Sequence, residues 1–223
     1  MFASKDFKYL FISNPRTGTK SIRTVFGPHV YMIKDPYAQQ SSGHMQISEC
    51  MRILAQQQSG FNPEQVEKIF VFWRDPVEKF ISAVNHLTDP AVFEDLTKNL
   101  SIMPGMNYSR TADFIPGGTT VDTITPEYAV YNFLPKLNCT DDARDIISLH
   151  FSKQTRWIVP SEKLQVFNYA NYEENFRTMA GFFGVDPNVE IPREHESIDG
   201  YTSLSPTTEA AVREYYAEDY ALI

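Results

Sequence analysis

The chain has 223 residues, with 20 Lys+Arg against 28 Asp+Glu and a formal net charge of −8. This length suits one α/β domain, so we expect residues 1–223 to form a single domain. An acidic chain of ordinary composition is neither a disordered segment nor a general nucleic-acid binder, which needs a basic surface. Residues 1–80 nevertheless carry ten basic and seven acidic side chains, a net of +3, which leaves −11 for the rest. We therefore look for an anionic ligand in the first third.

The predicted elements begin with a strand at residues 8–13, which runs into a turn-rich loop at residues 14–19. A short helix is expected over residues 20–26, because Ile22 and Phe26 share one face. A strand, a glycine-containing loop and a helix in this order form the phosphate-binding turn of many α/β sheets. The pattern therefore predicts an anion site at this loop.

The next elements continue the α/β pattern. A short strand is expected at residues 30–33 and a helix at about residues 45–57. Residues 68–73 form an uninterrupted apolar run, which is typical of a central parallel strand covered on both faces. This strand ends at Arg74, and Pro76 suits the first turn of a following helix.

The rest of the chain predicts mainly helices. Residues 99–123 contain several prolines and glycines and look irregular, which favours a functional loop. Asn171 is expected to cap a helix that Gly184 ends. The other expected elements are helices at 126–134, at 141–150 and from 206 to about 220, and a strand at 164–167.

The first loop differs from a kinase-type P-loop. That motif, G-x-x-x-x-G-K-S/T, would end at Lys20 and Ser21 and require glycines where Asn14 and Thr19 stand. Backbone N–H groups at a helix N-terminus still favour a phosphate. The alternative is a plain strand–helix turn with capping hydroxyls. The side chains that add hydroxyls or charge are Arg16, Thr17, Thr19, Lys20 and Ser21.

Two motifs in this order resemble those of sulfotransferases that use 3′-phosphoadenosine-5′-phosphosulfate (PAPS). Pro-Arg-Thr-Gly-Thr-Lys-Ser, residues 15–21, is similar to their 5′-phosphosulfate loop. Phe-Val-Phe-Trp-Arg-Asp-Pro, residues 70–76, with Ser82 eight residues after Arg74, is similar to their 3′-phosphate motif. The late helix and the segment from residue 195 to Tyr201 resemble the family's closing part more weakly. The branch with the nearest pattern contains carbohydrate sulfotransferases.

The resemblance implies an enzyme that transfers the sulfuryl group of PAPS, its co-substrate, to an acceptor hydroxyl, most simply that of a carbohydrate. No metal cofactor is expected. With the predicted elements, it implies a P-loop-like, three-layer α/β fold with a central, mainly parallel sheet flanked by helices. The acidic remainder of the chain favours a neutral or lightly charged acceptor, because repulsion slows the approach of a polyanion.

The same resemblance assigns the site residues. Arg16 would lie at the leaving oxygen, where it supplies charge but cannot donate a proton at neutral pH. Arg74 and Ser82 would hold the 3′-phosphate, while Trp73 lies near the adenine or in the core. Tyr201 in the closing segment is also assigned to the cofactor. The residues expected at the 5′-phosphate are Arg16, Thr17, Gly18, Thr19, Lys20 and Ser21.

The expected general base is His44, which lies between the two phosphate motifs. In related carbohydrate sulfotransferases a histidine at this place in the order is the base. A helix N-terminus at His44 would lower its pKa and favour the neutral imidazole. A helix-capping or buried histidine is the alternative, and Glu49 one turn later is the other candidate base. His86 is expected to be structural or to line the acceptor site.

Two other functions compete with this hypothesis. A P-loop nucleotide or small-molecule kinase would need a magnesium-binding carboxylate, for which Asp75 is the only candidate at a strand end. A non-catalytic module could keep the fold without turnover. Cys50 and Cys139 are expected to be free, buried thiols. No apolar run reaches the roughly 18 residues of a membrane span, and residues 1–8 lack a signal core, so we expect a cytoplasmic protein.

Overall fold

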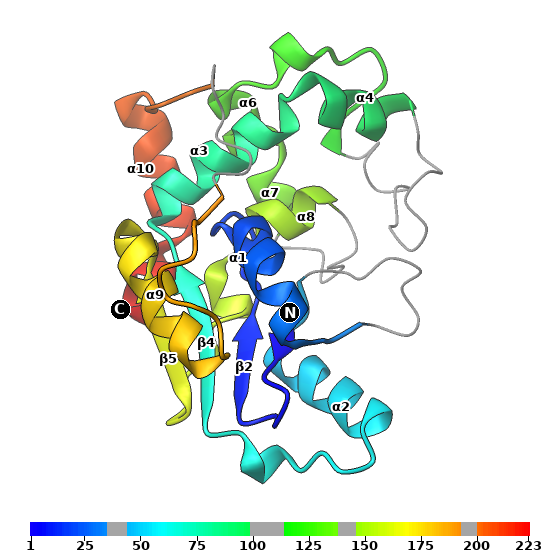
Figure 1. Cartoon of the computed structure of the whole chain (residues 1–223). Helices are drawn as coiled ribbons and strands as arrows, with labels where there is room; N and C mark the ends of the chain where they lie inside the picture. Colours follow the sequence, from blue (N-terminus) through cyan, green and yellow to red (C-terminus); the bar gives the residue numbers. More distant parts are fainter. Residues whose placement is uncertain (35–43, 99–113, 138–145, 193–199) are drawn as a thin grey trace. The chain divides into compact units, whose positions relative to one another are not determined.

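The structure is a computed structural model, and it describes residues 1–34, 44–98, 114–137, 146–192 and 200–223 (Figure 1). The chain divides into two compact units. The sheet unit comprises residues 1–74, 154–196 and 223, and the helical unit comprises residues 75–153 and 197–222. The single domain expected over residues 1–223 stays a prediction.

The sheet unit is built on a mixed sheet with the strand order β3-β1-β2-β4-β5 among the described residues. Its strands are β1 Phe2–Ala3, β2 Tyr9–Ile12, β3 Tyr31–Met32, β4 Lys68–Trp73 and β5 Leu164–Asn168. Strands β2, β4 and β5 run parallel, and β1 pairs antiparallel with β2 and β3. The carboxyl ends of the three parallel strands therefore meet at one edge of the sheet, where α/β folds bind their ligands.

One face of this sheet carries an aromatic core under two helices. Alternate strand residues point to the same face, so Phe11 of β2 and Phe70 and Phe72 of β4 share it. Helices α1 (Thr19–Phe26) and α9 (Tyr172–Phe182) contribute the side chains that cover them. Leu10, Ile12, Ile69, Val71 and Trp73 alternate with these residues and are buried as well. The central strands are thus covered on both faces, as their continuous apolar runs predict.

The sheet unit has a further helix and several 3₁₀ turns among the described residues. Helix α2 spans Ile47–Gln57 and buries Cys50, whose thiol lies 3.0 Å from the sulfur of Met1. Burial raises the pKa of this free thiol to about 12, so it stays protonated. Single 3₁₀ turns complete the unit at Gly27–His29 (η1), Pro63–Gln65 (η2), Gln154–Arg156 (η5) and Tyr169–Asn171 (η6).

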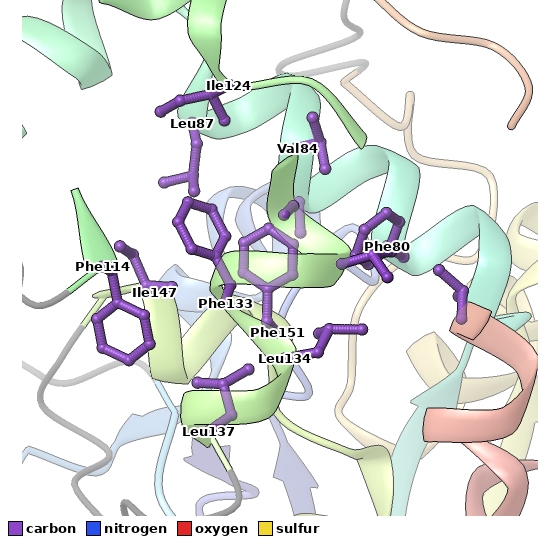
Figure 2. Close-up of a cluster of buried hydrophobic side chains, with 14 of the residues drawn as sticks. Phe80, Val84, Leu87, Phe114, Ile124, Phe133, Leu134, Leu137, Ile147 and Phe151 are labelled. Atoms are coloured by element: carbon purple, nitrogen blue, oxygen red, sulfur yellow. The ribbon is translucent and has the colours of Figure 1, made fainter. Parts of the chain in front are cut away.

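The helical unit packs short helices around an apolar core (Figure 2). Its elements are α3 Pro76–Leu87, α4 Pro90–Lys98, η4 Val121–Thr123, α6 Pro126–Asn132, α7 Leu134–Leu137, α8 Ile146–Phe151, α10 Pro206–Tyr215 and η7 Ala217–Leu222. Phe80, Val84 and Leu87 lie one turn apart on α3 and face Phe133 and Phe151 in this core. None of the described helices is long and apolar enough to cross a membrane.

The predicted α/β class and mainly parallel central sheet flanked by helices are confirmed, but several elements differ. Strand β1 was not predicted, since two residues carry no periodicity. The helix expected at 126–134 is two helices, and the last helix ends at Tyr215 before a 3₁₀ turn. Asn171 occupies the expected cap position, but its side chain makes no capping hydrogen bond. Cys139 and residues 99–113 and 141–145 lie outside the described residues.

Candidate functional site

The loop after β2 closes around one backbone carbonyl. The oxygen of Asn14 accepts hydrogen bonds from the hydroxyls of Thr17 at 2.7 Å and Thr19 at 3.2 Å. Arg16 adopts a left-handed backbone conformation with a φ of 64°, which is uncommon for any residue with a Cβ atom. Both hydroxyls that the sequence assigned to phosphate therefore shape the loop in this structure. The contact of these hydroxyls with phosphate stays a prediction. Because both hydroxyls donate to the Asn14 carbonyl, the backbone N–H groups of the loop are the donors that could bind a phosphate.

Helix α1 begins directly after this loop, at Thr19. Its N-cap residue is Gly18, which has no side chain to cap the first turn. The first N–H groups of a helix lack intrahelical acceptors and carry the positive end of the helix dipole. Lys20 is exposed on the same turn, whereas Ser21 is buried and hydrogen-bonded to the Tyr172 hydroxyl. This turn is suited to bind an anion.

Gly18 is required by the geometry of the loop. Its φ is +71°, and a Cβ atom at this position would lie 2.7 Å from Cε2 of Tyr172. The Tyr172 hydroxyl donates to the Gly18 carbonyl at 3.1 Å, and burial raises the pKa of this phenol. Tyr172 was not predicted from the sequence, because its partner lies 154 positions away in the chain.

Two arginines lie close together at this loop, Arg16 within it and Arg74 in contact with its backbone. The guanidinium of Arg74, which follows β4, donates from Nη1 to the carbonyl of Arg16 at 3.1 Å. Its Cζ atom also lies 4.6 Å from the centroid of the Tyr169 ring, within cation–π range. Burial and the neighbouring Arg74 charge lower the pKa of Arg16 to about 10, so the Arg16 side chain remains positive at neutral pH. Two adjacent positive charges favour a multiply charged anion.

A buried amide connects the two loops that carry these arginines. Gln154 Oε1 accepts from Asn14 Nδ2 at 2.7 Å and from the Arg74 backbone N–H at 3.0 Å. Its Nε2 donates to the Arg74 carbonyl at 2.7 Å. Asn14 Nδ2 also donates to the carbonyl of Phe72 in β4. Gln154 was not predicted from the sequence, since no local pattern marks it.

His44, which precedes α2, contacts the backbone just before the same loop. Its Nδ1 is 2.8 Å from the carbonyl oxygen of Ser13, which can only accept, so Nδ1 carries the hydrogen and Nε2 is left as the acceptor. Burial lowers the pKa of His44 to about 4 against the opposing Ser13 hydrogen bond, and the charges of Arg23 and Arg16 lower it further. The imidazole is therefore neutral at pH 7.

The physical cause of this lowered pKa differs from the predicted one. Helix α2 begins at Ile47 with Gln46 as its N-cap, so His44 precedes the helix. Burial and nearby cations, rather than the helix dipole, keep the imidazole neutral. Glu49, the other candidate base, lies in the first turn of α2.

The remaining candidate residues belong to the helical unit. Ser82 lies on α3, and one turn later Asn85 pairs with the backbone of Tyr201 through both ends of its amide, at 2.8 and 2.9 Å. Residues three apart share a helix face, so Ser82 and Tyr201 are brought to the same face of α3. Arg74, by contrast, belongs to the sheet unit, as the last residue of its segment 1–74. His86 packs edge-on against His150, which fits the structural role.

Comparison with known proteins adds little to this geometry. No family model and no curated protein matches the chain. Among solved structures, a sulfotransferase from Alicyclobacillus acidocaldarius aligns with 96% of this chain and 93% of its own, at 13% identity and a TM-score of 0.35. A TM-score of this size does not establish a shared fold.

Taken by itself, the sheet unit gathers the groups needed to bind an anion and accept a proton. An uncapped helix N-terminus, two guanidinium groups and a neutral imidazole all lie at residues that follow β2 or β4 or contact those residues. Within the described ranges, no three His, Cys, Asp or Glu side chains are grouped to hold a metal ion. The arrangement suits transfer of an anionic group to a hydroxyl.

Proposed function

We propose that this protein is a PAPS-dependent sulfotransferase that transfers the sulfuryl group to an acceptor hydroxyl, with His44 as the general base. One observation carries the proposal: a neutral imidazole and two positive guanidinium groups surround a single strand–loop–helix turn. His44 contacts the carbonyl of Ser13, and Arg74 contacts that of Arg16, three residues later. The motifs at residues 15–21 and 70–76 give this cluster its expected ligand.

Positive charge at the loop would bind the donor and stabilise its leaving group. Arg16 and the first N–H groups of α1 would hold the 5′-phosphosulfate, with Gly18, Lys20 and Ser21 in the same turn. Arg74 would hold the 3′-phosphate, and we assign Ser82 and Tyr201 of the helical unit to the same nucleotide. As the bond from sulfur to the bridging oxygen breaks, negative charge grows on that oxygen, and Arg16 offsets it electrostatically.

The acceptor proton would go to Nε2 of His44. As the acceptor oxygen bonds to sulfur, its proton moves to the imidazole and adenosine 3′,5′-bisphosphate leaves. A pKa of about 4 in the free protein keeps the base unprotonated. A bound polyanion favours the imidazolium form and raises this pKa towards neutrality, which improves a general base.

The acceptor we propose is a neutral or lightly charged carbohydrate, because most of the acidic residues lie beyond residue 80. A cytoplasmic location agrees with Cys50, which is buried as a free thiol. The kinase alternative has less support. Asp75, its candidate metal ligand, accepts hydrogen bonds from the N–H groups of Val77 and Glu78 and so caps α3.

Calorimetric titration with adenosine 3′,5′-bisphosphate and with adenosine 5′-phosphate tests the proposal. We expect the bisphosphate to bind at least about tenfold more tightly, since a charge-assisted pair with Arg74 contributes roughly 1.5–3 kcal/mol. Equal affinities would reject PAPS as the donor. Magnesium-dependent hydrolysis of ATP by the same preparation would favour the kinase instead.

A further inference from the structure

Gln154 is fully buried, and its amide holds the ends of two neighbouring strands together. Three hydrogen bonds of 2.7 to 3.0 Å join it to the side chain of Asn14, which follows β2, and to both backbone groups of Arg74, which follows β4. A planar amide that binds both the N–H and the C=O of one residue fixes the orientation of that residue's backbone.

The hydrogen bonds continue from Gln154 into both phosphate motifs. The carbonyl of Asn14 accepts the hydroxyls of Thr17 and Thr19, which closes the first loop. The guanidinium of Arg74 reaches back to the carbonyl of Arg16 in that loop. Every residue in this chain of contacts belongs to the sheet unit. Gln154 thus lies where the two motifs are joined.

We propose that Gln154 is a positioning residue that orients Arg74 towards the 3′-phosphate of the donor. This inference rests on the proposed function. Gln154 acts through the backbone of Arg74 and is not assigned a contact with the ligand. Buried polar networks are sensitive to loss of one member, because its former partners are left without hydrogen bonds.

Gln154→Met, which keeps the length of the side chain and removes its amide, is the principal test. We expect adenosine 3′,5′-bisphosphate to bind about tenfold more weakly, while binding of adenosine 5′-phosphate changes less than about twofold. Gln57→Met is the matched control. Gln57 also uses both ends of its amide, towards the Lys34 carbonyl and the Tyr31 hydroxyl in the same unit, and its loss should leave both affinities unchanged.

A double-mutant cycle separates positioning from general stability. If Gln154 acts through Arg74, adding Gln154→Met to Arg74→Ala should cause no further loss of bisphosphate binding. Additive losses, or an equal loss for both nucleotides, would overturn the proposal. If Gln154→Met does not fold, Gln154→Asn retains a buried amide but is too short to span Asn14 and Arg74, and the same selective loss is expected.

The wild-type titration distinguishes the two levels of failure. A wild-type protein that does not prefer the bisphosphate would overturn the proposed function and, with it, the role of Gln154. A wild-type preference that survives unchanged in both Gln154 variants would overturn only the role of Gln154.

Discussion

Both units bury an apolar core and some polar side chains, but only in the sheet unit do the buried polar groups lie among the candidate site residues, and this difference locates the chemistry. At the strand ends of the sheet unit, Asn14, Thr17 and Gln154 are fully buried polar residues joined by hydrogen bonds of specific geometry. The helical unit has a core of Phe80, Phe133 and similar apolar side chains, and its buried Lys79 donates to the carbonyls of His150 and Ser152. Apolar cores tolerate substitution when volume is kept, whereas buried polar groups need their partners. Substitutions of the buried polar residues at the strand ends should therefore impair function more than volume-conserving substitutions in the apolar core of the helical unit.

The largest effect is expected when histidines of the two units are compared. His44→Ala should lower kcat by about 10²–10⁴-fold, because a positioned base is lost. Its affinity for adenosine 3′,5′-bisphosphate should change less than about twofold, since the imidazole contacts the backbone at Ser13. Steady-state assays with a labelled donor and calorimetry measure the two quantities.

His86→Ala in the helical unit is the control for this comparison. It removes an edge-on ring contact with His150, and kcat should stay within about threefold of wild type. If His44→Ala retained turnover, or lost turnover and binding together, His44 would be structural and Glu49 would be the next candidate.

Two glycines of the sheet unit, Gly18 and Gly27, should differ in how much a substitution by alanine lowers stability. Gly18→Ala should reduce the free energy of unfolding by about 2–4 kcal/mol, because it adds left-handed strain and a clash with Tyr172. Gly27→Ala is the matched control, since Gly27 has a helical φ of −46° and a Cβ atom there would meet nothing within 4 Å. Urea unfolding of both variants gives the difference, and equal stabilities would contradict the packing at Gly18.

A smaller effect is expected for the two hydrogen bonds between the side chain of Asn85 on α3 and the backbone of Tyr201. Asn85→Ala breaks two hydrogen bonds to the backbone of Tyr201 and should cost about 1–2 kcal/mol of stability. If Tyr201 contributes to nucleotide binding, the affinity for adenosine 3′,5′-bisphosphate should fall by about two- to fivefold as well. A stability loss without an affinity loss would remove Tyr201 from the cofactor site.

The smallest effect concerns pH. The folded protein holds the pKa of His44 near 4, below the ordinary value of 6.5, so the unfolded chain binds the proton more tightly. Stability from this group is therefore present above pH 6.5 and is lost as the pH falls towards 4. Relative to His44→Gln, the wild type should lose about 1–2 kcal/mol over this interval. Parallel urea titrations at about pH 7 and about pH 4.5 measure it, and an unchanged difference would contradict the burial of the imidazole.

Local sequence patterns predicted elements whose causes are local. Strand β4 matches its apolar run from Lys68 to Trp73, and α3 begins where Pro76 follows Asp75, the capping residue. Asn171 stands at the predicted N-cap position of α9, but its predicted capping hydrogen bond was wrong. Asn168 already accepts the N–H of Ala170 in the turn before α9, and Asn171 makes no cap bond.

The candidate site was predictable only in part. Arg16, Gly18 and Arg74 were predicted as candidate residues because they belong to two recognisable sequence motifs. The structure brings these motifs together. Gln154, Tyr169 and Tyr172 were missed because their contacts span 80 or more positions and have no periodicity. The hydroxyls of Thr17 and Thr19 were identified, yet their bonds to Asn14 depend on a loop shape that composition does not specify.

The hydrogen bond between Tyr172 and Gly18 joins residues that are far apart in the sequence, and this affects the order of folding during synthesis. The two residues are 154 positions apart, so a ribosome that adds about 5–20 residues per second exposes Gly18 on the order of ten seconds or more before Tyr172. Until then the glycine turn has no phenol against it, and β4 has no β5 beside it. The turn at the head of the chain thus reaches its final form only late in synthesis, and a nascent chain arrested before α9 should not retain the nucleotide.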